Sequence, residues 1–250
     1  YTINNAFKPL DELFLFPPRF FVRNPTMDNF YDLVYLIGSS WVPFSRYLSN
    51  TIIIPILGTA GHVIFASAAA YPLAKYRFPG SKALSTMVVL SLMFTPHVTG
   101  IPNYMIMSRL GWIDTHASII IPAWAFPLGL FLMRQFMEQL PTSLLEAAKM
   151  DGASEYRIFW QIVMPNVKPA WLTLIILRLP SLWGSDGGSF IYSENLKTLN
   201  YALGQIIQGG IARAGVGAAV GLVLMIVPIV SFIISQSNVI QTMATSGIKD

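Results

Sequence analysis

Few side chains in this sequence have the types and spacing of a catalytic or metal-binding site. Cysteine is absent, which excludes disulfides, thiolate ligands and cysteine nucleophiles. The three histidines, His62, His97 and His116, lie within or at the edge of long uncharged apolar segments, with no cluster of other metal ligands around them. We therefore predict no metal site and no cofactor, and we expect these imidazoles to pack in the protein or to line a cavity.

The polar residues of segment 138–165 form the clearest local pattern in the chain. Ser143 and Glu146 have the spacing of a capping box, which predicts the start of a short helix. Gly152 can end that helix, because glycine accepts the left-handed conformation just past a helix C-terminus. Ser154 can cap a second short helix, which we expect to stop at the proline that ends the segment. An ordinary amphipathic connector would show the same pattern.

Composition places this segment in a membrane protein. The 250 residues are 54% hydrophobic and 11% charged, whereas soluble domains carry about 25% charged residues. The net charge of +4 comes from scattered side chains, with no basic run to follow a phosphate backbone, so nucleic acid is not an expected partner. We expect membrane lipid to cover much of the surface.

Uncharged apolar segments predict the architecture, because a helix needs about 20 mostly apolar residues to cross the hydrocarbon core. The fourth segment is short and contains Arg178, the only charged residue inside a predicted span. We predict an all-α polytopic protein with five transmembrane helices. The five segments are 47–74, 83–108, 115–133, 169–185 and 214–235.

Two further patterns concern the packing of these spans. Gly217 and Gly221 form a small-xxx-small face, which permits close contact with a partner subunit or with another helix of this chain. Prolines are expected to interrupt the spans, and the carbonyls that they free must find a local partner or face a water-filled cavity. These prolines are Pro55, Pro122, Pro127, Pro180 and Pro228.

The segments divide the chain into an extracellular or interfacial arm (1–46), a transmembrane domain (47–237) and a C-terminal tail (238–250). Lysine and arginine in the short loops predict that the turn 75–82, the segment 138–165 and the tail are cytoplasmic, with the arm outside. Over the whole chain the basic residues divide evenly, so this orientation depends on the short loops.

Segment 146–165 resembles the EAA loop of permease subunits in binding-protein-dependent ABC importers. The family pattern is EAA, three residues, Gly, nine residues and I-x-L-P, and this sequence departs from it only at Met164, which replaces leucine. Similarity to carbohydrate permeases of the maltose-transporter type covers nearly everything from Phe7 onward. Segments 191–198 and 235–249 are similar to a branch common in Gram-positive bacteria that is associated with oligosaccharides.

The resemblance implies a type I importer fold of six spans in a bacterial cytoplasmic membrane, so a further span is expected upstream of Tyr1. It implies a second homologous permease, two ATP-binding subunits, an extracellular solute-binding lipoprotein and a sugar or oligosaccharide substrate. It also implies that the loop docks on the ATPase subunit, with Glu146 either a polar contact or only a reciprocal cap. The coupling positions are Glu146, Ala147, Ala148, Asp151, Gly152, Ile162, Met164 and Pro165.

Two other classes of protein remain open on the residues alone. A secondary, ion-coupled transporter would need an intramembrane carboxylate, and none of the five segments contains one. A membrane enzyme would need convergent catalytic groups, which are not visible. The sequence has no G-x-x-x-x-G-K-[ST] phosphate loop, so we expect ATP hydrolysis on a separate chain.

Arg178 and Trp183 are the candidate residues of a substrate pathway. An unpaired arginine facing lipid is costly, so Arg178 should face the pore, the partner subunit or the membrane surface. Its donors suit sugar hydroxyls, and the Trp183 ring could stack on a pyranose. Alternatively, Arg178 binds carbonyls freed near Pro180 or pairs across the subunit interface.

Overall fold

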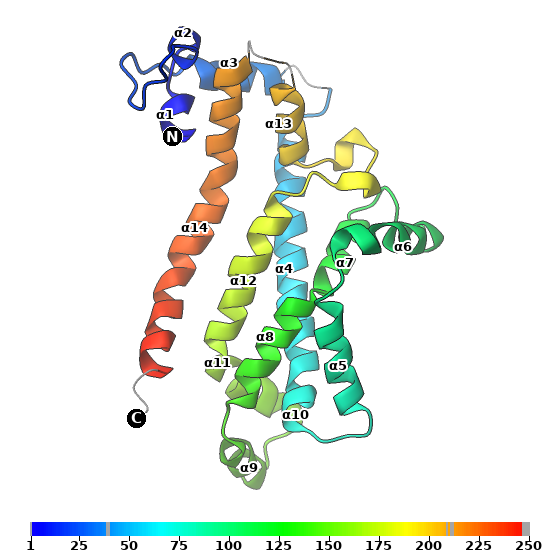
Figure 1. Cartoon of the computed structure of the whole chain (residues 1–250). Helices are drawn as coiled ribbons and strands as arrows, with labels where there is room; N and C mark the ends of the chain where they lie inside the picture. The colour runs from blue at the N-terminus through cyan, green and yellow to red at the C-terminus, as the bar shows by residue number, and fades with distance from the viewer. Residues whose placement is uncertain (1, 39–40, 209, 211–212, 247–250) are drawn as a thin grey trace.

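The described part of the chain is helical throughout. The computed structural model describes residues 2–38, 41–208, 210 and 213–246, apart from the side chains of 96, 97 and 234–246. The elements in this part are all helices, which confirms the predicted fold class (Figure 1). They are α1 (Thr2–Ala6), α2 (Leu10–Leu13), α3 (Asp28–Gly38), α4 (Phe44–Lys75), α5 (Ser81–Ser91), α6 (Pro96–Arg109), α7 (Ala117–Trp124), α8 (Pro127–Glu138), α9 (Thr142–Met150), α10 (Glu155–Arg157), the π-helix η1 (Ile158–Val163), α11 (Met164–Asn166), α12 (Lys168–Trp183), the 3₁₀ helices η2 (Gly188–Phe190) and η3 (Glu194–Leu196), α13 (Leu199–Ile207) and α14 (Ala214–Ser246).

Several helices are long and apolar enough to cross a membrane. Three stretches in the described part meet this condition: α4, the stretch Ala117–Glu138 formed by α7 and α8, and Ala214–Ile233 of α14. A fourth candidate is the pair Glu155–Asn166 and Lys168–Trp183, which is bent by 73°. Length and composition therefore support a polytopic membrane protein, although they yield three or four spans rather than the predicted five.

The segment 83–108 was predicted as one transmembrane helix, and that prediction is wrong because the segment forms two helices. α5 ends at Ser91 and α6 begins at Pro96. Figure 1 shows α5 running along α8, whereas α6 turns away from the bundle. The cause is Thr95, whose extended conformation (φ −81°, ψ 151°) is the one that a following proline favours.

The same effect separates α7 from α8, where Phe126 precedes Pro127 and has φ −102° and ψ 104°. The other prolines of the predicted spans do not interrupt their helices, so that expectation is wrong for them. Pro55, Pro122, Pro180 and Pro228 all lie inside continuous helices. Among these five prolines, only Pro127 therefore stands at a break.

α4 lies at the centre of the bundle, where it contacts α7, α8 and α12 (Figure 1). Buried apolar side chains form one cluster toward the α9 end and another toward the α3 and α13 end. The small face of α14 contacts this chain's own helices: a Cβ on Gly217 would lie 3.6 Å from Ile207, and one on Gly221 would lie 3.3 Å from Thr2. Contact within the subunit is thus the alternative that the structure supports.

The N-terminal arm is an ordered unit at the opposite end of the molecule from α9 (Figure 1). The Lys8 ammonium donates to the Arg19 carbonyl at 2.5 Å, and the Glu12 carboxylate accepts the Arg23 N–H at 3.0 Å. α1 and α3 pack against α14, so the arm is attached to a spanning helix.

Two of the predicted domain boundaries fall inside helices. α4 begins at Phe44, directly after Pro43, and so includes the last residues of the predicted arm 1–46. α14 continues to Ser246 and passes the predicted start of the tail at residue 238. The last predicted tail residues, 247–250, lie outside the described part of the chain.

Candidate coupling site

The start of α9 differs from the prediction. The helix begins at Thr142, directly after Pro141, and no side chain caps it. Pro141 is held at φ −61° and ψ 131°, and its carbonyl accepts the N–H of Leu144 at 3.3 Å. Ser143 therefore lies inside the first turn, and the predicted capping box is wrong. Glu146 is not a reciprocal cap, and its side chain is exposed.

The end of α9 confirms the predicted role of Gly152, which has φ +76°. Its N–H donates to the Lys149 carbonyl at 3.0 Å, and the N–H of Ala153 donates to the Ala148 carbonyl at 3.0 Å. These two bonds form a Schellman motif, which satisfies carbonyls left open at a helix end. A Cβ added to Gly152 would meet nothing within 4 Å, so the backbone conformation, rather than space, requires glycine.

The second short helix begins as predicted. Ser154 Oγ accepts the N–H of Arg157 at 3.4 Å, which caps α10. The predicted stop at Pro165, however, is wrong, because α11 continues to Asn166 and the 73° bend follows at Val167.

The π-helix η1 explains how the chain passes through Pro165. Within it, the N–H of Met164 donates to the carbonyl of Phe159, five residues earlier. A proline has no N–H to donate, and its ring crowds the preceding turn of an α-helix. The wider π turn just before Pro165 relieves both constraints.

The predicted coupling residues divide into an exposed group and a packed group. The packed group joins the apolar cluster shared by α4, α8 and α12. Glu146, Ala147, Asp151, Gly152 and Pro165 are exposed, whereas Ala148 is buried and Ile162 and Met164 are half-buried. The loop thus presents one surface outward while the other is anchored in the spans.

Large apolar side chains extend the exposed surface, and the sequence pattern did not single them out. Met150 is 88% exposed and Tyr156 is 75% exposed. Both residues adjoin the Gly152 turn, so a search for apolar residues beside a helix end would have found them.

A polar network fastens α9 to the end of α4. Lys149 Nζ lies 2.7 Å from Glu155 Oε1 and donates to the Tyr76 hydroxyl at 3.1 Å. The Tyr71 and Tyr76 hydroxyls donate to Glu155 Oε2 at 3.2 and 2.5 Å. Hydrogen bonds from Lys149 and Tyr76 lower the pKa of Glu155. The hydrogen bond that Lys149 donates to Glu155 raises the pKa of Lys149. The sequence pattern did not predict this network.

Lys75 makes a second link at the same end of the molecule. Its ammonium group donates to the carbonyls of Glu138 at 3.1 Å and Leu140 at 2.5 Å. These carbonyls lie at the end of α8 and just beyond it. Lys75 therefore joins the C-terminal ends of α4 and α8 immediately before α9 begins.

The break between α7 and α8 is satisfied by side chains from two other helices. The Ala123 carbonyl lacks a helical donor because the residue four positions on is a proline. Arg178 Nε donates to that carbonyl at 3.2 Å, and its guanidinium carbon lies 5.0 Å from the centre of the Phe126 ring. His62 Nδ1 lies 2.9 Å from the Trp124 carbonyl. The partner of Arg178 is thus a carbonyl freed by Pro127, not one near Pro180.

His62 and Trp183 are both packing residues in this conformation. His62 is buried, as predicted, and a Cβ on Gly129 would lie 2.0 Å from its Nε2. Trp183 is also buried, and its indole N–H donates to the Leu224 carbonyl of α14 at 3.1 Å. The Trp183 ring is therefore held between α12 and α14.

The apolar helical bundle and its projecting EAA loop define the class of protein, a permease subunit of an importer. The chain belongs to the family described as "Binding-protein-dependent transport system inner membrane component", whose model matches residues 21–245.

Individual relatives agree with the family assignment. Protein LplC of Bacillus subtilis is 33% identical over 197 residues, which is 77% of this chain and 63% of LplC. The arabinooligosaccharides transport system permease protein AraQ of Halalkalibacterium halodurans is 30% identical over 227 residues, covering 90% of this chain and 80% of AraQ. A chain of a bacterial ABC transporter that imports alginate has a similar fold, with a TM-score of 0.79 at 22% identity, over 95% of this chain and 88% of that one.

The pKa shifts of the Lys149–Glu155 pair predict that the stability of α9 does not change with pH near neutrality. The lowered pKa of Glu155 contributes stability at every pH above the pKa that Glu155 has in the unfolded chain, and this contribution is lost as the pH falls through the folded-state pKa. The raised pKa of Lys149 contributes stability at every pH below its unfolded-state pKa, and this contribution is lost as the pH rises through the folded-state pKa. The protection of α9 amides against hydrogen exchange, corrected for the intrinsic exchange rate at each pH, should therefore be constant from about pH 5 to about pH 9.

Glu155→Gln should lower that protection about two- to fivefold across the same pH range, because both partners are partly exposed to solvent. Glu146→Gln is the matched control, since it removes the same charge from the same region and Glu146 has no hydrogen-bond partner in the described part of the chain. Equal protection in the two variants would show that the network does not hold α9.

Proposed function

We propose that this chain is the transmembrane subunit of an ATP-driven importer of sugars or oligosaccharides. The family match supports transport, and the name of AraQ supports the substrate class. The observation that carries the proposal is the geometry of α9. Its exposed face presents Glu146 away from the bundle, while Leu145 and Ala148 are buried in a core shared with the spans.

Four partner chains belong to the proposal. A second homologous permease completes the translocation pore, two ATP-binding subunits supply the energy, and an extracellular solute-binding lipoprotein delivers the sugar. The family's description supports the dependence on a binding protein. The sequence contains no phosphate loop, which supports hydrolysis of ATP on separate chains, so this subunit itself is not an enzyme.

We infer five spans, made by α4, by α5 with α6 as a broken span, by α7 with α8, by α12, and by α14. The short-loop lysine and arginine bias supports a cytoplasmic α9 and C-terminus. The resemblance of segments 191–198 and 235–249 supports a Gram-positive bacterium as the source. The arm then lies outside. The separation of the arm from α9 along the bundle agrees with this orientation (Figure 1).

In the proposed mechanism, closure of the ATPase dimer displaces α9 as a rigid body. Glu146 and Asp151 are the polar contacts to the ATPase, and Met150 and Tyr156 are the apolar ones. Ala148, Ile162 and the other packed positions pass the displacement to α8 and α12, because close-packed interiors transmit strain.

Gly152→Val tests this mechanism. A non-glycine residue in a left-handed conformation costs about 1–2 kcal/mol, and valine adds branching at Cβ. The turn should therefore change shape while the spans remain folded. We expect normal amounts of the subunit in the membrane but a loss of sugar uptake and of binding-protein-stimulated ATP hydrolysis.

Two controls isolate the turn from general strain. Gly152→Asn should retain most uptake, because asparagine tolerates the left-handed region. Gly80→Val introduces the same strain at φ +89°, also with nothing within 4 Å of the new Cβ, but outside α9. Normal uptake by Gly152→Val at normal expression, or equal loss in Gly80→Val, would contradict the coupling role.

We also infer that Arg178 contacts the sugar in addition to the Ala123 carbonyl. Only its Nε is engaged by that carbonyl, and the guanidinium fork offers further donors. The Trp183 ring can stack on the sugar only after α14 moves away from that ring. Arg178→Met should raise the transport KM about two- to tenfold, the value of a lost hydrogen bond, while the complex still assembles and keeps its basal ATPase rate.

Arg178→Lys separates the two roles of this side chain. Lysine can still donate to the carbonyl but lacks the planar fork, so KM should rise while assembly stays normal. If Arg178→Met fails to assemble and Arg178→Lys transports with unchanged KM, Arg178 only supports the helix break. Unchanged transport by both variants would also refute the sugar contact.

A further inference from the structure

A groove runs along α4 from its C-terminal end toward the α7–α8 break. Its first part is a hollow of about 1210 Å³ around the turn that follows α4. The second part, of about 440 Å³, shares Leu73 and Phe78 with the first. The third, of about 360 Å³, shares Ala69, Val88 and Leu130 with the second. Because consecutive parts share lining residues, they form one continuous groove between α4, α5 and α8.

The end of the groove near α9 is basic. Arg77 and Lys82 line it, are exposed, and form no ion pair with any residue in the described part of the chain. Arg134 also lines it and pairs with Glu138 at 2.7 Å through one terminal nitrogen. The Nε of Arg134 is buried and has no hydrogen-bond partner among the described residues. The exposed cations Arg77 and Lys82, beside the Arg134 guanidinium, make this end fit an anion.

The remainder of the groove is apolar. Its second and third parts are lined by residues such as Phe65, Leu84 and Met87, and no charged side chain lines either part. Ser91, the last residue of α5, lines both parts, and Phe126 at the α7–α8 break lines the third. The groove therefore ends at the level where both neighbouring helices break.

The length of the apolar part corresponds to one leaflet of a membrane. α4 rises about 15 Å between Lys75 and Phe65, at about 1.5 Å per residue. The hydrocarbon core is about 30 Å thick, so one leaflet contributes about half of that. An acyl chain that begins at the basic end would thus reach the end of the groove at the membrane midplane.

We propose that this groove binds one anionic phospholipid. The phosphate lies among Arg77, Lys82 and Arg134, and an acyl chain lies along α4 between α5 and α8. A free phosphate ion would use only the basic end, whereas a lipid uses the full length of the groove. Thr142, the first residue of α9, lines the basic end as well, so the headgroup lies beside the proposed coupling helix.

The assembled transporter in phosphatidylcholine vesicles tests this proposal. A phosphatidylglycerol carrying a photoreactive group on its acyl chain is added, and crosslinked peptides are located by mass spectrometry. Crosslinks should concentrate on α4 and α5 residues of the groove, such as Ala69 and Met87. Unlabelled phosphatidylglycerol should reduce them, whereas inorganic phosphate should not.

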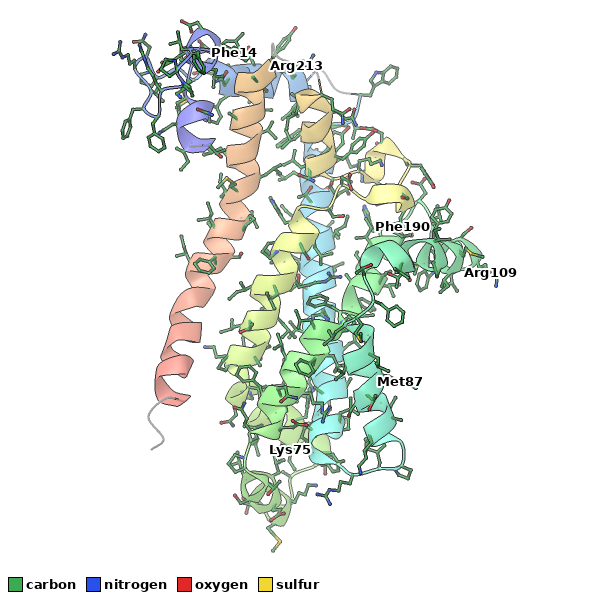
Figure 2. All side chains as sticks on the ribbon, in the orientation of Figure 1. Phe14, Lys75, Met87, Arg109, Phe190 and Arg213 are labelled. Atoms are coloured by element: carbon green, nitrogen blue, oxygen red, sulfur yellow. The ribbon has the colours of Figure 1, made fainter. Side chains whose placement is uncertain are left out.

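Charge variants test the headgroup end. Arg77→Gln and Lys82→Gln should each reduce groove crosslinking about fivefold, the value of one basic residue near an anionic lipid surface. Arg109→Gln is the matched control, because Arg109 lies at the tip of α6, far from the Lys75 end of the bundle (Figure 2). Equal labelling in all three variants would overturn the headgroup assignment.

A second pair of variants tests the acyl end without changing charge. Ala69→Trp fills the groove and should reduce crosslinking about fivefold or more, whereas Ala83→Trp, at an exposed position outside the groove lining, should not. Both alanines are exposed, so the folded bundle should tolerate either change. Three results would overturn the proposal. They are lipid crosslinks spread evenly over all spans, lipid crosslinks on a partner subunit in place of this groove, and displacement of the lipid probe by inorganic phosphate.

Discussion

The hydrocarbon core of a membrane contains no water, so every backbone donor and acceptor within it needs a partner in the protein. This constraint governs the bundle most clearly at the break between α7 and α8. There, Arg178 of α12 donates to the Ala123 carbonyl, whose helical donor Pro127 removes, and His62 of α4 contacts the Trp124 carbonyl, which the break leaves open. An unsatisfied carbonyl costs several kcal/mol in lipid, so the relative positions of α4, α12 and the broken α7–α8 segment depend on these contacts.

The helices α4, α8 and α12 also hold the loop that contains α9. Met133 and Met137 of α8, Ala70 of α4 and Leu174 of α12 share one apolar cluster with Leu145 and Ala148 of α9. Lys75 and the Glu155 network add polar links between α4, α8 and α9. The loop and the helix break are therefore two ends of one packed body. A displacement at α9 has a direct structural path to the break between α7 and α8.

Local features of this structure could be predicted, and features that depend on distant partners could not. The helical fold follows from hydropathy, and the turn at Gly152 and the cap at Ser154 depend only on adjacent residues. The capping box failed because Pro141 already starts α9. The span 83–108 failed because hydropathy does not register the extended residue before Pro96. The carbonyl partner of Arg178 and the tyrosine partners of Glu155 come from remote segments, so local residue spacing does not predict them.

The π-helix η1 determines which side chains of the EAA loop face the core. Residues five apart in an α-helix differ by about 140° around the axis and cannot share one face. Ile158 and Val163 are five apart, yet both are fully buried in the same core, because the wider π turn brings them to one side. In an ordinary α-helix, one inserted or deleted residue turns one flank by about 100° relative to the other and shifts it by about 1.5 Å. The π turn takes up one extra residue without that rotation, so a one-residue gap in this segment of related permeases represents gain or loss of the π turn between α9 and the spans.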